Sequence, residues 1–153
     1  MADKRARATG KGKDHSFVGI PHFILRSDEF GQLDGNEVKL LLELAKEYKG
    51  SNNGDFSAAW SVMKTRGWRS SGTVQAAKDG LLRKGWLICT RHGGSHRCSL
   101  YGITWWSLDE CGGKSLYKAE TKARHEWRKN DLGTRYSDRS ASHTECTDGK
   151  EAA

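Results

Sequence analysis

Residues 57–91 read SAAWSVMKTRGWRSSGTVQAAKDGLLRKGWLICTR, and this stretch predicts two helices joined by a very short turn. The first helix is expected over 57–66, with a serine as its N-cap. The second is expected to open at Ser70 or Ser71 and to stop at Gly85. Only about four residues separate the two helices, and so short a glycine-containing connection is typical of a helix-turn-helix.

Each of these helices ends in the same way, on a glycine followed by a tryptophan. Gly67 and Gly85 fit the left-handed residue past a helix end, and Trp68 and Trp86 are expected to fold back onto the preceding turn. Gly80 lies inside the second helix, where glycine costs about 1 kcal/mol relative to alanine. Close approach of another helix at that point would explain the glycine.

A further helix is expected upstream, between Asp34 and Gly50. Asp34 followed three residues later by Glu37 is a capping-box pattern, in which each side chain reaches an unpaired backbone N–H. Leu40 and Leu44 lie off the stripe predicted to be buried, so they need a second surface: the N-terminal run, the C-terminal tail or another subunit. The predicted stripe comprises Val38, Leu41, Leu42, Ala45 and Tyr48.

The hydrophobic period changes after the second helix of the pair. Residues 86–91 and 99–106 are rich in aromatic and branched residues, which favours strands. They flank residues 92–97, HGGSHR, which read as a hairpin turn with a cationic tip. Near the N-terminus, the apolar run 17–25 is expected to start extended because Pro21 keeps its predecessor out of the helical region.

The chain is therefore expected to contain one folded domain with polar extensions. We expect a disordered basic arm at 1–15, the domain at 16–110, a tail at 111–130 and a disordered polar tail at 131–153. Within the tail, Lys114–Asn130 is expected to form a helix. The residues on one side of that helix are Leu116, Ala119, Ala123 and Trp127.

Composition excludes several classes of protein. The 153 residues contain no run of about 18 apolar residues, so a membrane span is not expected. The first residues, MADKRARATGKGKD, have no apolar stretch and do not resemble a secretory signal. Four irregularly spaced cysteines do not form a disulfide framework, and a cytoplasmic location with reduced thiols is expected.

The positive charge is concentrated in one part of the chain. The net charge is +7, from 26 Lys and Arg against 19 Asp and Glu. Residues 63–97 alone contain eight Lys and Arg against the single acid Asp79. Such an asymmetry favours a polyanionic partner, because each neutralised phosphate releases condensed counterions.

Residues 17–110 resemble the winged-helix proteins of bacterial plasmids and phages, including the DNA-binding domains of replication initiators. The matching pieces are FVGIPHFILRS, LDGNEVKLLLELAKEYKGSNNGDFS, the pair RGW and KGW, and TRHGGSHRCSLYGITWW. The resemblance implies an α+β, mainly α fold: a winged helix-turn-helix of three helices and a two- to three-stranded wing, here followed by a C-terminal helical tail. It also implies that the second helix of the pair enters the major groove of DNA while the wing touches phosphates or the minor groove.

The residue chemistry agrees with that placement. In the first turns of the helix, Arg69 can pair with guanine, Gln75 with adenine, and Thr73 can meet a thymine methyl group. The two serines can donate hydrogen bonds to phosphate, and Lys78 is expected one turn further on the same outer face. The candidate DNA-binding residues are Arg69, Ser70, Ser71, Thr73, Gln75 and Lys78 in the helix, and Arg91, His92, His96 and Arg97 around the wing.

Other chemistry has less support. The pattern formed by Cys89, His92, His96 and Cys98 contains zinc-ligand types, but its spacing matches no common zinc module, and a metal is not expected. A P-loop, a nucleophile elbow, an HExxH helix and a Rossmann fingerprint are all missing from the sequence, so neither an enzyme nor a cofactor is expected.

The leading hypothesis is a sequence-specific double-stranded DNA-binding protein of a mobile element, acting in replication initiation or transcriptional regulation. The alternative is a protein-interaction module on a winged-helix scaffold, either an accessory replication factor or an inhibitor of a host defence complex. A homodimer is a further expectation, through Leu40 and Leu44 or through Leu116 and Trp127. A protein partner is expected to use the first long helix or the tail.

Overall fold

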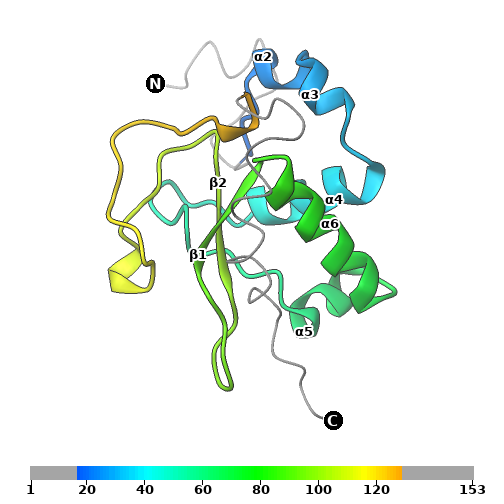
Figure 1. Cartoon of the computed structure of the whole chain (residues 1–153), viewed down its shortest axis with the longest axis vertical. Helices are drawn as coiled ribbons and strands as arrows, with labels where there is room; N and C mark the ends of the chain where they lie inside the picture. The colour runs from blue at the N-terminus through cyan, green and yellow to red at the C-terminus, as the bar shows by residue number, and fades with distance from the viewer. Residues whose placement is uncertain (1–16, 129–153) are drawn as a thin grey trace, which may run out of the picture.

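The computed structural model of the chain describes residues 17–128, so the expected disordered segments 1–15 and 131–153 lie outside the described residues. The described part is a mixed α+β structure with one two-stranded antiparallel sheet, which confirms the α+β class (Figure 1). Its helices are α2 (His22–Leu25), α3 (Asp28–Gly31), α4 (Gly35–Ala45), α5 (Trp60–Met63) and α6 (Ser71–Arg83), with 3-10 turns η1 (Lys64–Arg66), η2 (Cys111–Gly113) and η3 (Glu126–Arg128). The strands are β1 (Leu87–Arg91) and β2 (Leu100–Ile103).

Helix α4 begins with the predicted capping box. The Asp34 side chain accepts from the backbone N–H of Glu37 at 2.8 Å, and the Glu37 side chain accepts from the backbone N–H of Asp34 at 2.9 Å. Glu37 is also buried, and its carboxylate pairs with Lys84 at the end of α6 at 2.6 Å. The same side chain therefore caps one helix and ties it to another. The helix ends at Ala45, one turn before the expected limit at Gly50.

The predicted buried stripe of α4 is confirmed at Leu41 and Ala45, which are buried, and is wrong at Leu42. Leu40 and Leu44 are fully buried, whereas Leu42, placed on the predicted stripe, is 46% exposed. Three consecutive leucines allow two neighbouring registers, and packing against α6 selects the one centred on Leu40, Leu41 and Leu44. Leu40 and Leu44 thus belong to the core of this chain and are not a free surface for a dimer.

The two helices of the predicted pair end as expected. Gly67 and Gly85 have φ values of 83° and 79°, in the left-handed region. The N–H of Trp68 reaches the carbonyl of Met63 at 3.3 Å, and the N–H of Trp86 reaches that of Leu81 at 2.9 Å. These are the backward bonds of Schellman stops, and both tryptophans are buried. The first helix is shorter than predicted, because residues 57–59 are not helical and α5 begins at Trp60.

The sheet is a hairpin with a small additional bridge. β1 pairs antiparallel with β2, with Leu87 opposite Ile103 and Cys89 opposite Tyr101. Phe56, between α4 and α5, exchanges two backbone hydrogen bonds with Tyr101 at 3.2 and 2.8 Å, so one residue adds to the far edge of β2. β2 ends at Ile103, three residues before the predicted limit of the second strand.

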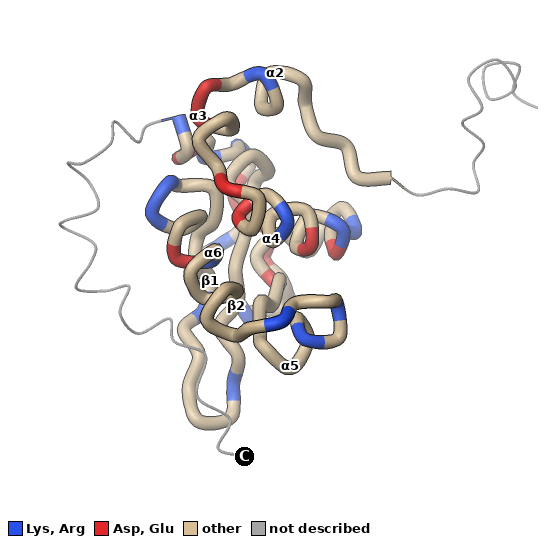
Figure 2. Tube along the Cα trace, turned by 90° about the vertical axis from the view of Figure 1, so that its right-hand side faces the viewer, with Lys and Arg blue, Asp and Glu red and all other residues tan. Residues whose placement is uncertain are grey.

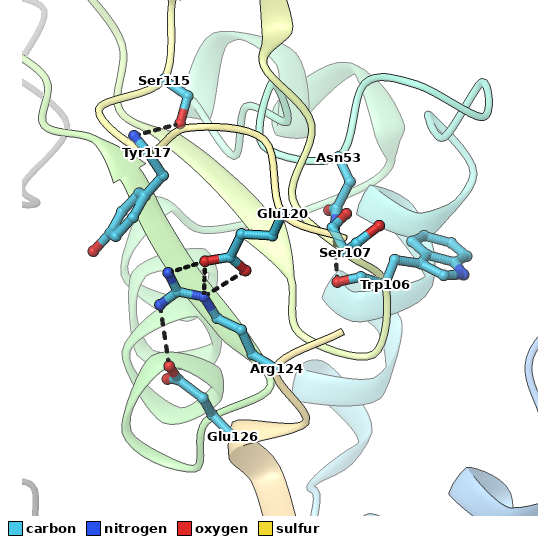
Figure 3. A network of polar contacts seen from close by, with 8 residues as sticks. All are labelled: Asn53, Trp106, Ser107, Ser115, Tyr117, Glu120, Arg124 and Glu126. Carbon is cyan, nitrogen blue, oxygen red and sulfur yellow. Dashed lines mark hydrogen bonds and ion pairs between the residues drawn. The ribbon is translucent and has the colours of Figure 1, made fainter. Parts of the chain in front are cut away.

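Asn53 fastens the loop before this bridge to the end of β2. Its side chain is fully buried, accepts from the N–H of Ile103 at 2.8 Å and donates to the carbonyls of Ile103 and Ser107, each at 2.9 Å. Figure 3 shows this side chain beside Trp106 and Ser107. These bonds satisfy the backbone where the strand pairing stops. This amide side chain therefore connects the loop after α4 to the end of β2.

The predicted helix at Lys114–Asn130 was wrong for the part that the structure describes. Residues 114–125 contain no helix, and the N–H groups of Leu116, Glu120 and His125 bond to distant carbonyls at 2.7–2.8 Å. The segment lies on the side of the hairpin away from α6 (Figure 1). Trp127 is 2% exposed and stacks on Trp86 with ring centroids 4.8 Å apart. The core thus extends beyond residue 110, the expected end of the domain.

Ion pairs of Arg124 with Glu120 and Glu126 connect residues within this segment. Arg124 donates from Nε to both carboxylate oxygens of Glu120 at 2.9 Å and from Nη1 to Glu126 at 3.3 Å (Figure 3). The hydrogen bond from Arg124 lowers the pKa of Glu120.

Between residues 17 and 128, the structure holds no helix with the length and apolar character that crossing a membrane requires.

Candidate nucleic-acid interface

The first turn of α6 faces solvent. Arg69, Ser70 and Ser71 are exposed, and Thr73 and Gln75 are half-buried. Ser70 is the N-cap residue, but its side chain makes no capping hydrogen bond. The first turn of α6 therefore has no side-chain cap for its backbone N–H groups. These five predicted residues come together at one end of the helix.

Lys78 is misplaced in the predicted site. Its side chain is fully buried, and its ammonium lies 5.5 Å from the centroid of the Tyr101 ring on β2. Lys78 follows Val74 by four residues and precedes Leu81 by three, so helical geometry puts it on the buried face of α6. Its spacing from these two apolar residues could have revealed this in the sequence. We remove Lys78 from the candidate interface.

Asp79 takes an unexpected position on the outer face of α6. Its side chain is exposed, and its Oδ1 accepts a hydrogen bond from Nε2 of Gln75 at 3.0 Å. The sequence contained the signal for this contact, because residues four apart share one helix face. The outer face of α6 therefore carries a carboxylate where the sequence suggested only neutral and cationic groups.

The hairpin turn presents the predicted wing residues. His92, His96 and Arg97 are exposed, while Arg91 is half-buried and donates from Nη2 to the carbonyl of Cys98 at 3.1 Å. A Cβ atom at Gly93 would lie 2.9 Å from the carbonyl oxygen of Arg97, so only glycine fits this tight turn. The turn projects from the end of the molecule at which α5 lies, as Figures 1 and 2 both show.

Fewer cations are available than the composition suggested. Arg66 pairs with Glu47 at 2.7 Å and with Glu43 at 3.5 Å, and Lys84 pairs with the buried Glu37. Lys78 is buried as well, so only some of the eight Lys and Arg side chains of residues 63–97 are exposed. Those that are exposed are Lys64, Arg69, Arg83 and Arg97.

One cation outside that window joins the surface. Lys39 is an exposed residue of α4, and its Nζ lies 4.6 Å from the centroid of the Trp68 ring. Trp68 immediately precedes Arg69 in the sequence. A cation over an indole face is stabilised by the ring quadrupole. Sequence reasoning missed Lys39 because it lies in a predominantly acidic part of the chain. The tertiary contact brings it to the turn between the paired helices.

The cysteine and histidine pattern is spread over different environments. Cys89 is buried with its Sγ 3.8 Å from Nδ1 of His92, whereas Cys98 is exposed. Within residues 17–128, no three His, Cys, Asp or Glu side chains gather in an arrangement that could hold a metal ion. A third cysteine, Cys111, lies after the sheet. Burial raises the pKa of its thiol, and the negative charges of Asp55 and Asp109 raise it further. This thiol is protonated at neutral pH and is a weak nucleophile.

Comparison of the chain with protein-family models, curated proteins and solved structures found no match.

Proposed function

We propose that this chain is a sequence-specific double-stranded DNA-binding protein with a winged helix-turn-helix arrangement. In this proposal α6 enters the major groove and the hairpin turn between β1 and β2 contacts the backbone. The elements follow the order that such a domain requires: α4, the Phe56 bridge, α5 with η1, α6, and then the β1–β2 hairpin. The connection from Gly67 to Ser70 is as short as helix-turn-helix turns are.

The observation that carries the proposal is the open first turn of α6. Ser71 and the two residues before it, Arg69 and the N-cap Ser70, face solvent, while the opposite face of the helix packs on α4 and β1. The major groove of B-DNA admits one helix, and the N-terminal part of that helix lies nearest the base edges. The segment 111–128 runs on the other side of the hairpin and leaves this turn uncovered (Figure 1).

The biological role within this proposal depends on the resemblance to plasmid and phage proteins. Replication initiation and transcriptional regulation both use a duplex-binding domain of this kind, and a mobile element would require either. The geometry of α6 and the hairpin applies equally to both roles. DNA binding itself is therefore the property to test first.

The test is a titration of fluorescent mixed-sequence duplex DNA at increasing salt with the full chain and three variants. Affinity should fall steeply as salt rises, because phosphate contacts release counterions. Arg69→Ala and Arg97→Ala should each weaken binding, and Arg97→Ala, which removes a backbone contact, should also reduce the slope of log affinity against log salt by about 0.9 per lost phosphate contact. Arg26→Ala is the matched control, since Arg26 is exposed beside α2 at the opposite end of the molecule (Figure 1).

Three outcomes would reject parts of this proposal. If the unaltered chain does not bind duplex DNA at low salt, the function is wrong. If Arg97→Ala binds like the unaltered chain at every salt concentration, the hairpin turn does not contact DNA. If Arg26→Ala weakens binding as much as Arg69→Ala, the charge acts nonspecifically and the surface assigned here is wrong.

A protein-interaction module is the second candidate function, and exposed apolar side chains favour it. Phe17 is 88% exposed and Phe23 and Leu25 are 46% and 44% exposed, all in the segment before α3. Of the two expected dimer surfaces, Leu40 and Leu44 are internal and Trp127 is buried, which leaves Leu116. This candidate predicts a stable complex with a protein partner in nuclease-treated host lysate, which replacing Phe17 by Ser would weaken.

A further inference from the structure

The exposed face of α6 has an unusual composition for a helix expected to approach a polyanion. Gly72, Ala76 and Asp79 are exposed at intervals of three and four residues, and Gln75 is half-buried beside them. These spacings put the four residues on one face. The face combines two small residues, which permit close approach, with one carboxylate and one amide. Its only formal charge among these four residues is negative.

The amide and the carboxylate form one unit. Nε2 of Gln75 donates to Oδ1 of Asp79 at 3.0 Å, and the carboxylate forms no ion pair with any residue of the described range 17–128. The second carboxylate oxygen of Asp79, an exposed residue, remains as an acceptor. A ligand that satisfies this unit must supply hydrogen-bond donors.

We infer that Asp79 is a specificity-determining residue that accepts a hydrogen bond from the N4 amino group of a cytosine in the major groove, with Gln75 positioning its carboxylate. This inference rests on the proposed DNA-binding function. Cytosine presents an amino donor in the major groove, and aspartate is one of the side chains that accept from it. Guanine and thymine present acceptors at the corresponding atoms, which a carboxylate repels.

The same carboxylate acts against nonspecific binding. On a mixed-sequence duplex its negative charge lies near phosphates and, wherever guanine or thymine faces it, meets an acceptor without a compensating donor. Replacing Asp79 should therefore have two opposite effects: weaker discrimination at one base pair and tighter binding to DNA of arbitrary sequence. A side chain that only supported the helix through its contact with Gln75 would leave the preference at that base pair unchanged, so the loss of discrimination is the effect that decides.

The experiment is selection from a pool of random duplexes, followed by sequencing, with the unaltered chain, Asp79→Ala, Asp79→Asn and the control Glu110→Gln. Glu110 is an exposed acid outside α6, so its replacement matches the charge change alone. The unaltered chain and the control should select a motif with cytosine at one position. Asp79→Ala should lose that preference by about fivefold or more while keeping the remaining positions. Both Asp79 variants should bind a mixed-sequence duplex about two- to fivefold more tightly.

The outcomes separate this inference from the proposed function. If Asp79→Ala selects the same motif with the same cytosine preference, the inference is wrong and DNA binding stands. Salt-dependent binding without any selected motif also rejects the inference and leaves nonspecific DNA binding. If the unaltered chain does not bind duplexes at all, the proposed function fails and this inference fails with it. Thermal unfolding of each variant checks that the fold is retained.

Discussion

Replacing Gly80 by alanine is expected to destabilise the protein, although alanine is the better helix former. A Cβ atom at residue 80 would lie 1.9 Å from Oε1 of Glu37 and 3.0 Å from its Cδ. Glu37 is buried and bonded to both the N–H of Asp34 and Nζ of Lys84, so moving its carboxylate breaks a helix cap and an ion pair. The glycine is thus required by the approach of α4 to α6.

The expected change in the free energy of unfolding is the sum of one stabilising and two destabilising contributions. Alanine contributes about 1 kcal/mol of helix propensity relative to glycine. Loss of a helix cap costs about 1 kcal/mol, and loss of a hydrogen bond to a charged group costs about 1.5–3 kcal/mol. We therefore expect Gly80→Ala to lower the free energy of unfolding by about 1.5–3 kcal/mol. Gly72→Ala is the matched control in the same helix, because its Cβ would meet only the Ser70 hydroxyl at 3.5 Å.

Urea unfolding of the single and double variants tests this reasoning. Gly72→Ala should stabilise the protein by a few tenths of a kcal/mol to about 1 kcal/mol. In a Glu37→Ala background, which empties the space beside residue 80, Gly80→Ala should also become stabilising. The reasoning is refuted if Gly80→Ala destabilises the protein equally in both backgrounds, because the steric conflict with Glu37 would then not be the cause.

Two further predictions concern the segment after the sheet. Trp127→Ala should lower the free energy of unfolding by about 3–5 kcal/mol, because it removes a buried indole stacked on Trp86; a loss below about 1 kcal/mol in urea unfolding would show that the segment is not part of the core. Burial lowers the pKa of His125, and the positive charge of Arg128 lowers it further. The unfolded state binds more protons below about pH 6.5, so stability should fall as the pH decreases through that value. His125→Asn, which suits the positive φ of 46° at this position, should reduce this dependence in urea titrations at pH 7.5, 6.5 and 5.5; an unchanged dependence would exclude His125 as its source.

Only part of the candidate site could be predicted from the sequence. Arg69, Ser70 and Ser71 are exposed as the helix pattern indicated, and the hairpin turn carries its predicted cations. The pairing of Gln75 with Asp79 and the burial of Lys78 also follow from helical spacing, and a stricter helical projection would have found them. The availability of the other cations could not be predicted, because their acidic partners lie 19 to 47 residues away in the sequence.

The sequence alone determined the features that depend on neighbours within a few residues. These are the capping box at Asp34 and Glu37, the glycine stops at Gly67 and Gly85, and the turn of the hairpin. Local hydrogen bonds and allowed backbone angles decide such features before any long-range contact forms. Tertiary structure alone decided the buried face of α4 and the extended course of residues 114–125. In both cases the competing local arrangements are close in free energy, and burial of Leu40, Leu44 and Trp127 against distant elements selects between them.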